Sequence, residues 1–465
     1  PLGASNLCRV SASSHTPLSC LRLCYRQERT LTKNSKQMTE RAATQWQNWS
    51  RSLPASPAPV LTPTSVQELS ALMLSHSRGV RPVGSGHSWM PLVPTKHAIV
   101  KLDHFSSVGE IDPLTHQAWL GAGAKLHDLS PQLSERGYAF RNLGDIDVQT
   151  LAGATSTGTH GTGKELQGLA AEIQALKLVT GSGELLEISA HENSEWLDGA
   201  RVALGALGVI TEIKMQLVER FKLHRQVWPA SNKHTLENAE RYWDENRNFE
   251  FFYIPFSDTS LLLTHNVSTE PSTPANHDTS TSAMMQLKSL RDSLKWFTPL
   301  RRWLLKRAIA NEPTENVIGE SWDLLASERN VRFNEMEYHL PVERGLEALE
   351  EVRHYIETKR PDVFFPFEAR QTKSDSAWLS PFNGGNRISV AVHCYHKDAY
   401  DFLFTDVEPI FQKYGGRPHW GKLNSMTAAQ ARAWYPDFEN FAALRRELDP
   451  DGRLLNGYLS DLFEV

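Results

Sequence analysis

One loop in this sequence combines a cradle for an anion with a nucleophile. Gly84 and Gly86 flank Ser85, and neither glycine has a Cβ that would keep a bound anion away from the backbone N–H groups. His87 follows directly, and a neutral imidazole near neutral pH can act as a nucleophile. We therefore expect an anionic cofactor over this loop, with His87 in contact with it or bonded to it. The residues expected to bind this cofactor are Pro82, Val83, Gly84, Ser85, Gly86, His87 and Ser88.

Two further turns rich in small residues indicate the kind of cofactor. The first turn supplies Gly153, Ala154, Ser156, Thr157, Gly158, His160 and Gly161, and the second supplies Gly208, Val209 and Ile210. Three separated loops of this kind suit a long, folded dinucleotide better than a single triphosphate. The sequence therefore favours FAD.

Two common nucleotide-binding motifs are near misses. Residues 158–164 have the glycine spacing and the lysine of a Walker A loop, but Glu165 stands where that motif needs a hydroxyl for Mg²⁺. In the first loop, Trp89 takes the place of the third glycine of the Rossmann fingerprint, and its indole would prevent close packing of helix on strand. A P-loop NTPase and a Rossmann domain are therefore both disfavoured.

The composition is that of an ordinary globular protein. The 465 residues are 40% hydrophobic and 22% charged, and this length favours two or three domains. The formal net charge of −5 gives no reason to expect a nucleic-acid partner. The four cysteines make a poor disulfide framework, and no apolar run approaches the roughly 18–20 residues that cross a bilayer. We expect a cytoplasmic or membrane-associated protein.

The first 41 residues differ from the rest of the chain. They begin with Pro1, and residues 1–37 hold six basic residues against the single acid Glu28. A transit peptide has this Arg- and Ser-rich composition, but a non-native leader ahead of Met38 is the preferred interpretation. We expect residues 1–41 to be disordered in either case.

The elements that position the loops are predicted from apolar periodicity and turn residues. In residues 42–217 we expect helices over 64–76 and 126–136, strands over 98–102 and 117–123, and a hairpin within 171–189. Strands and helices mix there without a strict βαβ order, which predicts an α+β fold. In residues 218–418 an antiparallel sheet backed by helices is expected, with helices at 234–245 and 342–359 and strands at 249–255, 260–266, 331–340, 363–371 and 387–395.

Two segments of the second half are less regular. Residues 267–283 are rich in Ser, Thr and Pro, which predicts a loop or a flexible excursion. Residues 286–309 mix Leu, Trp and Phe with Lys and Arg, which indicates an amphipathic helix that Pro299 interrupts. This helix either docks on the protein or makes peripheral contact with a membrane.

The motifs taken together resemble the vanillyl-alcohol oxidase superfamily, and within it the aldonolactone oxidoreductases, to which alditol oxidase is related. The resemblance rests on the loop at 82–88, Asn142-Leu143-Gly144 with 152–163, the turn at 205–210, Glu368-Ala369-Arg370, residues 415–422, Asp449-Pro450 and 456–459. It covers residues 42–465. The fold it implies has an FAD-binding domain of two small α/β subdomains (42–217), an antiparallel-sheet cap with helices (218–418) and a C-terminal segment that returns to the flavin (419–465).

The resemblance also implies roles for single residues. His87 matches the histidine joined covalently to the flavin 8α carbon, although a loop histidine that only hydrogen-bonds a phosphate is the alternative. Glu368 and Arg370, two apart in a predicted strand, project to one face and are implied to grip the substrate; otherwise they would be a surface ion pair. Lys422 is implied to lie near flavin N5. His419 is expected to shape the site beside it, and His393 matches a substrate-site histidine of alditol oxidase.

The resemblance implies the reaction as well. We expect oxidation of a sugar-1,4-lactone of the gulono-, galactono- or arabinono- type, with hydride transfer to FAD and no metal. Gly144 matches the glycine of the lactone oxidases, which favours O2 as electron acceptor and H2O2 as product; the alternatives are a dehydrogenase or an alditol oxidase. An inactive flavoprotein scaffold is disfavoured because Glu368, Arg370 and Lys422 are all present.

Overall fold

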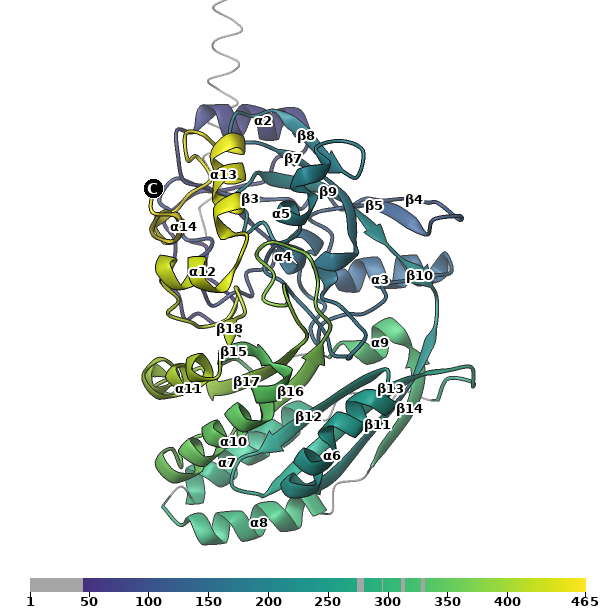
Figure 1. The fold of residues 1–465 in the computed structure, drawn as a ribbon, viewed down its shortest axis with the longest axis vertical. Coiled ribbons are helices and arrows are strands. Elements are labelled where there is room, and N and C mark those ends of the chain that lie inside the picture. Colours follow the sequence, from purple (N-terminus) through teal and green to yellow (C-terminus); the bar gives the residue numbers. More distant parts are fainter. Residues whose placement is uncertain (1–44, 274–279, 295, 311–313, 328–330) are drawn as a thin grey trace, which may run out of the picture. The chain divides into compact units, whose positions relative to one another are not determined.

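The computed structural model describes residues 45–273, 280–294, 296–310, 314–327 and 331–465, which Figure 1 traces as an α+β arrangement. The predicted leader, residues 1–41, lies outside the described residues. Most strands belong to three sheets: one of three strands, one of five strands and one of eight strands. The first two sheets come from residues before 217, and the third comes from residues after 221.

The three-stranded sheet positions the histidine loop. It is parallel, in the order β1 (Val60–Leu61), β3 (Ala98–Lys101), β2 (Val80–Val83). Helix α2 (Val66–Ser75) precedes β2; Ser65 caps it by accepting from the Glu68 N–H. Because β2 ends at Val83, the loop at 84–88 leaves directly from the carboxyl end of a buried strand.

The five-stranded sheet positions the other two loops. Its strands are antiparallel, in the order β4 (Val108–Ile111), β5 (Gln117–Gly121), β9 (Val209–Gln216), β7 (Ile173–Val179), β8 (Leu185–Ser189). Helices α3 (Leu126–Glu135), α4 (Leu151–Ser156) and α5 (Leu197–Arg201) accompany it. The hairpin and the helix predicted for this region are confirmed, and β9 begins at the end of the turn at 205–208.

The eight-stranded sheet is the cap. All its neighbouring strands are antiparallel, and its order is β14 (Glu315–Glu320), β11 (Lys222–Ser231), β13 (Thr259–Ser268), β12 (Asn248–Ile254), β16 (Phe367–Thr372), β17 (Arg387–Tyr395), β15 (Phe333–Pro341), β18 (Arg417–Pro418).

Two helices, α6 (Asn232–Glu245) and α10 (Val342–Lys359), pack against this sheet (Figure 1). Trp243 of α6 and Val352 of α10 share one core with strand residues such as Phe251 and Val390. Since side chains alternate along a strand, every second residue of β15, β16 and β17 points away from these helices. The opposite face of the sheet is therefore left to other contacts.

The first of the two irregular segments differs from its prediction. Strand β13 continues to Ser268, so the predicted excursion at 267–283 begins as strand, and residues 274–279 lie outside the described residues. The amphipathic helix expected at 286–309, interrupted by Pro299, is present as two helices, α7 (Ser280–Leu294) and α8 (Thr298–Ala310). Pro299 is the second residue of α8, where a missing N–H leaves no helical hydrogen bond unmade.

The C-terminal segment packs onto the first half of the chain. Helices α12 (Ala428–Trp434), α13 (Phe438–Leu448) and α14 (Gly457–Phe463) bury their apolar faces in the core that also contains α2 and the five-stranded sheet. Over the part of the chain that the structure describes, every helix is too short or too polar to cross a membrane.

Candidate active site

The three predicted loops line one cleft, which we call the loop cleft. Its lining includes these predicted cofactor residues: Pro82, Val83, Gly84, Ser85, Gly86, His87, Ser88, Gly153, Ser156, Thr157, Gly208 and Ile210. Ala154, Gly158, Gly161 and Val209 are absent from the described residues that line it, and Ala154 and Val209 are fully buried in the core. The loops that sequence separates by about 120 residues therefore form one surface.

Close packing explains why glycine occupies these loops. A Cβ on Gly84 would lie 2.1 Å from the Thr150 hydroxyl, and one on Gly208 would lie 2.8 Å from the Val179 carbonyl oxygen. Gly86 has a φ of +72°, which L side chains rarely adopt. A bare backbone at these points can approach a bound anion closely. The backbone N–H groups of these loops fit the pyrophosphate of FAD, which the loops would hold.

A buried arginine that the sequence analysis missed ties two of the loops together. Arg81 donates from Nε to the Leu92 carbonyl at 2.7 Å, from Nη1 to Gly205 O at 2.7 Å and from Nη2 to Leu204 O at 2.8 Å. Burial lowers the pKa of its guanidinium to about 9. The arginine thereby sets the distance between β2 and the turn before β9.

His87 stands where the loop cleft meets a second pocket, which we call the polar pocket; it lines both. Its ring stacks on Trp49, with centroids 5.2 Å apart. Burial, with Lys422 and Lys125 nearby, lowers the pKa of His87 to about 4. Its imidazole is therefore neutral at pH 7 and keeps a nitrogen lone pair.

The polar pocket gathers all the predicted catalytic residues. Its lining is Trp49, His87, Trp89, Gly144, Asp145, Ile146, Gln149, Thr159, His160, Phe333, Glu335, Glu337, Glu368, Arg370, His393, His419 and Lys422. Strands β15, β16 and β17 present it on the sheet face opposite α6 and α10, and residues after β18 close one side. The return of the C-terminal segment therefore completes the pocket.

Glu368 and Arg370 share one face of β16, as predicted, but they are not a surface pair. Both residues are buried, and Arg370 Nε lies 3.1 Å from Glu368 Oε1. Arg370 Nη2 also donates to Glu337 Oε1 at 2.8 Å. Burial lowers the pKa of Arg370, but the surrounding carboxylates outweigh this and raise it, so the guanidinium stays charged. Burial raises the pKa of Glu368.

Lys422 and His393 meet on a second carboxylate, Glu335 of β15. Lys422 Nζ forms an ion pair with Glu335, and His393 Nε2 lies 3.6 Å from Glu335 Oε1. His393 Nδ1 is 3.0 Å from the Pro366 carbonyl oxygen, which orients the ring. Although burial raises the pKa of Glu335, Lys422 and His393 hold it at about 2.

The two remaining predicted histidines are both in the polar pocket. His419 accepts from the Gly421 N–H through Nδ1 at 2.9 Å, and burial lowers its pKa to about 3. His160 was expected with the phosphate loops, yet its Nε2 lies 3.2 Å from Glu337 Oε1. The reason is the path of the chain: just after His160, Gly163 donates to the Gln371 carbonyl at 2.7 Å, which draws the turn onto the cap sheet.

Gly144 also lines the polar pocket, and its backbone has no positive φ. The turn into Asp145 therefore does not require glycine. An added Cβ would instead lie 3.0 Å from Thr159 Cγ2 and 3.1 Å from His160 O. A methyl group here would require Thr159 and His160, which line the pocket, to shift by a few tenths of an ångström.

Several pocket residues were not predicted from the sequence, above all the acids of β15. Residues 333, 335, 337 and 339 read Phe, Glu, Glu, His, while Met336, Tyr338 and Leu340 join the cap core. This period of two is the signal that could have found Glu335 and Glu337, because it places two acids on one face of a predicted strand. The other missed residues are Trp49, Trp89, Asp145, Ile146, Gln149 and Thr159.

The fold and the two adjoining clefts define a flavoprotein of the vanillyl-alcohol oxidase type. A family model described as an FAD binding domain matches residues 57–189. The solved structure of cholesterol oxidase from B. sterolicum superposes with a TM-score of 0.75 at 18% identity, covering 90% of this chain and 96% of that chain.

The sequence comparisons identify the family within that class. The model of D-arabinono-1,4-lactone oxidase matches residues 213–462. L-gulono-1,4-lactone dehydrogenase of Mycobacterium tuberculosis is 37% identical, over 89% of this chain and 97% of that protein. L-gulonolactone oxidase of Bos taurus is 31% identical, over 90% of this chain and 98% of that protein. The chain belongs to the D-arabinono-1,4-lactone oxidase family.

Proposed function

We propose that this protein oxidises a carbinol carbon of a sugar-1,4-lactone, with FAD as its cofactor. One observation carries the proposal: His87 lines both the loop cleft and the polar pocket. A flavin held in the cleft would therefore adjoin the buried pocket that contains Glu368, Arg370 and Lys422. The gulono- and arabinono-lactones named for the family and its relatives set the substrate class.

Each pocket group has a task in this reaction. FAD, when bound, supplies the acceptor for the hydride. Arg370, held charged between two carboxylates, donates hydrogen bonds to substrate oxygens, and Glu368 accepts from a substrate hydroxyl. Lys422 places a positive charge where negative charge develops. His393 and Glu368 are the two candidates to accept the hydroxyl proton.

Anaerobic mixing with candidate substrates tests this function. We expect gulono-, galactono- or arabinono-1,4-lactone to bleach the flavin absorbance faster than xylitol does. Faster bleaching by xylitol would favour the alternative, an alditol oxidase. Absence of bleaching with every lactone and with xylitol would contradict both functions.

We also propose that His87 is covalently bonded to FAD at the flavin 8α carbon. The support is a neutral imidazole beside the loop cleft. The N–C bond would replace a C–H bond of the 8α methyl group and the N–H bond of the imidazole; both protons would leave, and the two electrons would stay on the flavin until O2 took them. Acid precipitation tests the bond: a yellow pellet supports it, and a colourless pellet with free FAD in the supernatant contradicts it.

The electron acceptor is a further proposal: O2, giving H2O2. Its support is Gly144, which lines the polar pocket and matches the glycine of the lactone oxidases. The relatives carry both names, oxidase and dehydrogenase, so similarity does not decide between them. Peroxide formed in equal amount to the lactone consumed supports an oxidase. Turnover that needs an artificial dye supports a dehydrogenase.

A last proposal concerns location: helices α7 and α8 rest on an anionic membrane surface. Trp296, Phe297 and Trp303 are 88%, 58% and 56% exposed, whereas large hydrophobic side chains elsewhere are mostly buried. Residues 280–310 hold seven basic residues and one acid, in a chain of net charge −5. Arg291 and Arg301 are buried, whereas the Lys306 side chain is 52% exposed and can face a membrane surface. Exposed aromatics among cations are typical of an interfacial contact.

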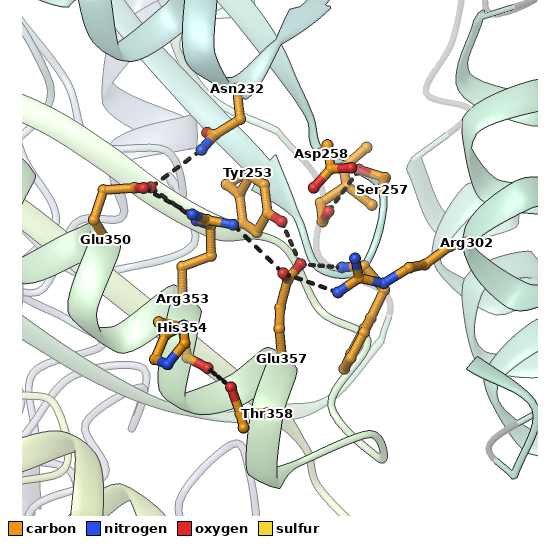
Figure 2. Close-up of polar contacts among 12 residues, drawn as sticks. Asn232, Tyr253, Ser257, Asp258, Arg302, Glu350, Arg353, His354, Glu357 and Thr358 are labelled. Carbon is orange, nitrogen blue, oxygen red and sulfur yellow. Dashed lines mark hydrogen bonds and ion pairs between the residues drawn. The ribbon is translucent and has the colours of Figure 1, made fainter. Parts of the chain in front are cut away.

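The helices that carry this surface are themselves anchored. Figure 2 shows Arg302 of α8 reaching Glu357 of α10, and their charged groups lie 3.2 Å apart. The test is co-sedimentation with vesicles. We expect binding to phosphatidylglycerol vesicles that weakens in high salt and in the variant W296S/W303S. Equal recovery with neutral vesicles, or no loss in the variant, would contradict the proposal.

A further inference from the structure

Strand β15 carries two buried acids that the reaction outlined above does not use. Glu335 and Glu337 are 3% and 1% exposed, and they lie two apart on the pocket face of the strand. A buried carboxylate is retained as an ion only when it is paired and hydrogen-bonded. The partners of these two acids therefore indicate what the acids do.

Each acid holds two groups that come from other parts of the chain. Glu337 Oε1 accepts a hydrogen bond from Arg370 Nη2 of β16 at 2.8 Å. The same oxygen lies 3.2 Å from Nε2 of His160, which follows α4. Glu335 pairs with Lys422, after β18, and with His393 of β17. Every predicted catalytic group except Glu368 and His419 is thus held by one of two neighbouring carboxylates.

The backbone of β15 adds to this arrangement. His419 N–H donates to the Glu337 carbonyl at 3.0 Å, and Leu423 N–H donates to the Glu335 carbonyl at 2.9 Å. These two bonds fix the segment on both sides of Lys422. The position of Lys422 therefore depends on β15 through both backbone and side chain.

We infer that Glu335 and Glu337 are positioning residues: Glu335 orients Lys422 and His393, and Glu337 orients Arg370 and His160. This inference rests on the proposed function for its kinetic consequences. Its structural content does not depend on which lactone reacts. Glu337 also links two parts of the protein, because His160 belongs to the flavin domain and Arg370 to the cap. One carboxylate thereby fixes the position of these two side chains relative to each other.

A metal ion is the competing use of Glu337. Ligand atoms of His160, Glu337 and His339 lie within 4.8 Å of one another, and His339 Nε2 has no hydrogen-bond partner. His160 Nε2 has only the Glu337 carboxylate, at 3.2 Å. Arg370 opposes this use, because its guanidinium donates to the same oxygen that would face the ion. A cation there would also be repelled by Arg370 at short range.

The test compares E337Q and E335Q with a matched control, E357Q. Glu357 of α10 is also a nearly buried carboxylate in a polar cluster, and it contacts Tyr253 of β12, Arg302 of α8 and Arg353 of α10 (Figure 2). It does not line the polar pocket. Rapid mixing without oxygen gives the lactone Kd and the rate of flavin reduction separately. Thermal unfolding of each variant measures stability alone.

The two variants should fail in different ways. We expect E337Q to raise the lactone Kd about tenfold or more, because Arg370 loses a charged hydrogen bond. E335Q should slow flavin reduction and shift its pH profile, with a smaller change in Kd, since Lys422 and His393 act on the reacting carbon. E357Q should change the melting temperature but neither kinetic constant. The same kinetic loss in E357Q would overturn the inference.

A double-mutant cycle and a crystal structure complete the test. If Glu337 acts through Arg370, E337Q should change Kd little in an R370Q background; additive losses would overturn the inference. A crystal structure of E337Q should show Arg370 displaced. This measurement needs no substrate, so it tests the inference even if the protein does not oxidise a lactone. Zinc recovered in equal amount with the wild-type protein and lost in H339A would also overturn it.

Discussion

At the scale of single residues, the chemistry depends on protonation states that burial sets. His87 is neutral because burial and two lysines hold its pKa at about 4, so the loop offers a nucleophile rather than a cation. Glu335 is ionised because Lys422 and His393 hold its pKa at about 2. Glu368 lies beside a charged arginine, yet burial raises its pKa. Neighbouring acids thus serve different purposes in one small pocket.

The first prediction concerns His87. In H87A, FAD should bind in part without a covalent bond, because the loop cleft remains, and most turnover should be lost. Acid precipitation and the kcat of the flavin-loaded variant measure the two effects. Full activity in H87A would refute a role for the bond.

The second prediction concerns Lys422. K422M keeps the length of the side chain but removes its charge, so flavin reduction should slow by about 10²–10³-fold. The lactone Kd should change much less, because Arg370 and Glu368 remain. Rapid-mixing kinetics measures both constants. A Kd effect as large as the rate effect would assign Lys422 to binding instead.

At the scale of elements, the strands of the cap sheet position the side chains of the polar pocket. Close packing in the loop cleft leaves no room for a side chain at the loop glycines. The period of two along β15, β16 and β17 sends apolar residues to α6 and α10 and polar ones to the pocket. The strand at 387–395 and the helix at 342–359 were predicted to the residue. The face that each strand presents was predicted only for Glu368 and Arg370, since facing depends on what packs above the sheet.

The third prediction tests the packing of the loops. In G84A the new Cβ would meet the Thr150 hydroxyl at 2.1 Å, so the loop must move, at a cost of about 1–3 kcal/mol of stability. FAD retention should fall with it. The matched control is G385A, where no atom lies within 4 Å of the added Cβ and φ is ordinary. Equal melting temperatures for the two variants would contradict this account.

At the scale of the whole molecule, the site exists because distant parts of the chain meet. The polar pocket takes residues from the flavin domain, the cap sheet and the segment after β18. His160 contacts Glu337 across 177 positions of sequence, and Lys422 contacts Glu335 across 87. Folding of both domains and of the C-terminal segment is therefore coupled to assembly of the pocket.

The fourth prediction concerns stability and pH for the molecule as a whole. Burial lowers the pKa of His265 and of His419 from 6.5 to about 3. Below pH 6.5 the unfolded chain therefore binds more protons than the folded one, so stability falls as the pH drops from 6.5 toward 3. At pH 5 each histidine should reduce stability by about 2 kcal/mol relative to pH 7.

Melting temperatures between pH 7.5 and 5 measure this effect, and H265Q supplies the comparison. Gln keeps a donor for the Leu324 carbonyl that His265 Nε2 contacts at 3.0 Å but does not titrate. The variant should lose less stability on acidification than the wild type. Subtracting the melting-temperature curve of H265Q from that of the wild type cancels the contributions of the other titrating groups. One of these is Asp375, whose pKa burial raises to about 6. Parallel curves would contradict the prediction.

From sequence alone, local spacing was enough to predict the glycine loops with His87 beside them, the α+β fold class and the shared face of Glu368 and Arg370. The roles of these residues rested on the family resemblance. These features are local, because a turn or a strand is specified by residues a few positions apart. Only the tertiary structure placed His160 against the cap and identified Glu335 and Glu337 as the residues that hold Arg370, Lys422 and His393. Cross-strand register and the return of the C-terminal segment decide those contacts, and they depend on how the whole chain buries its apolar surface.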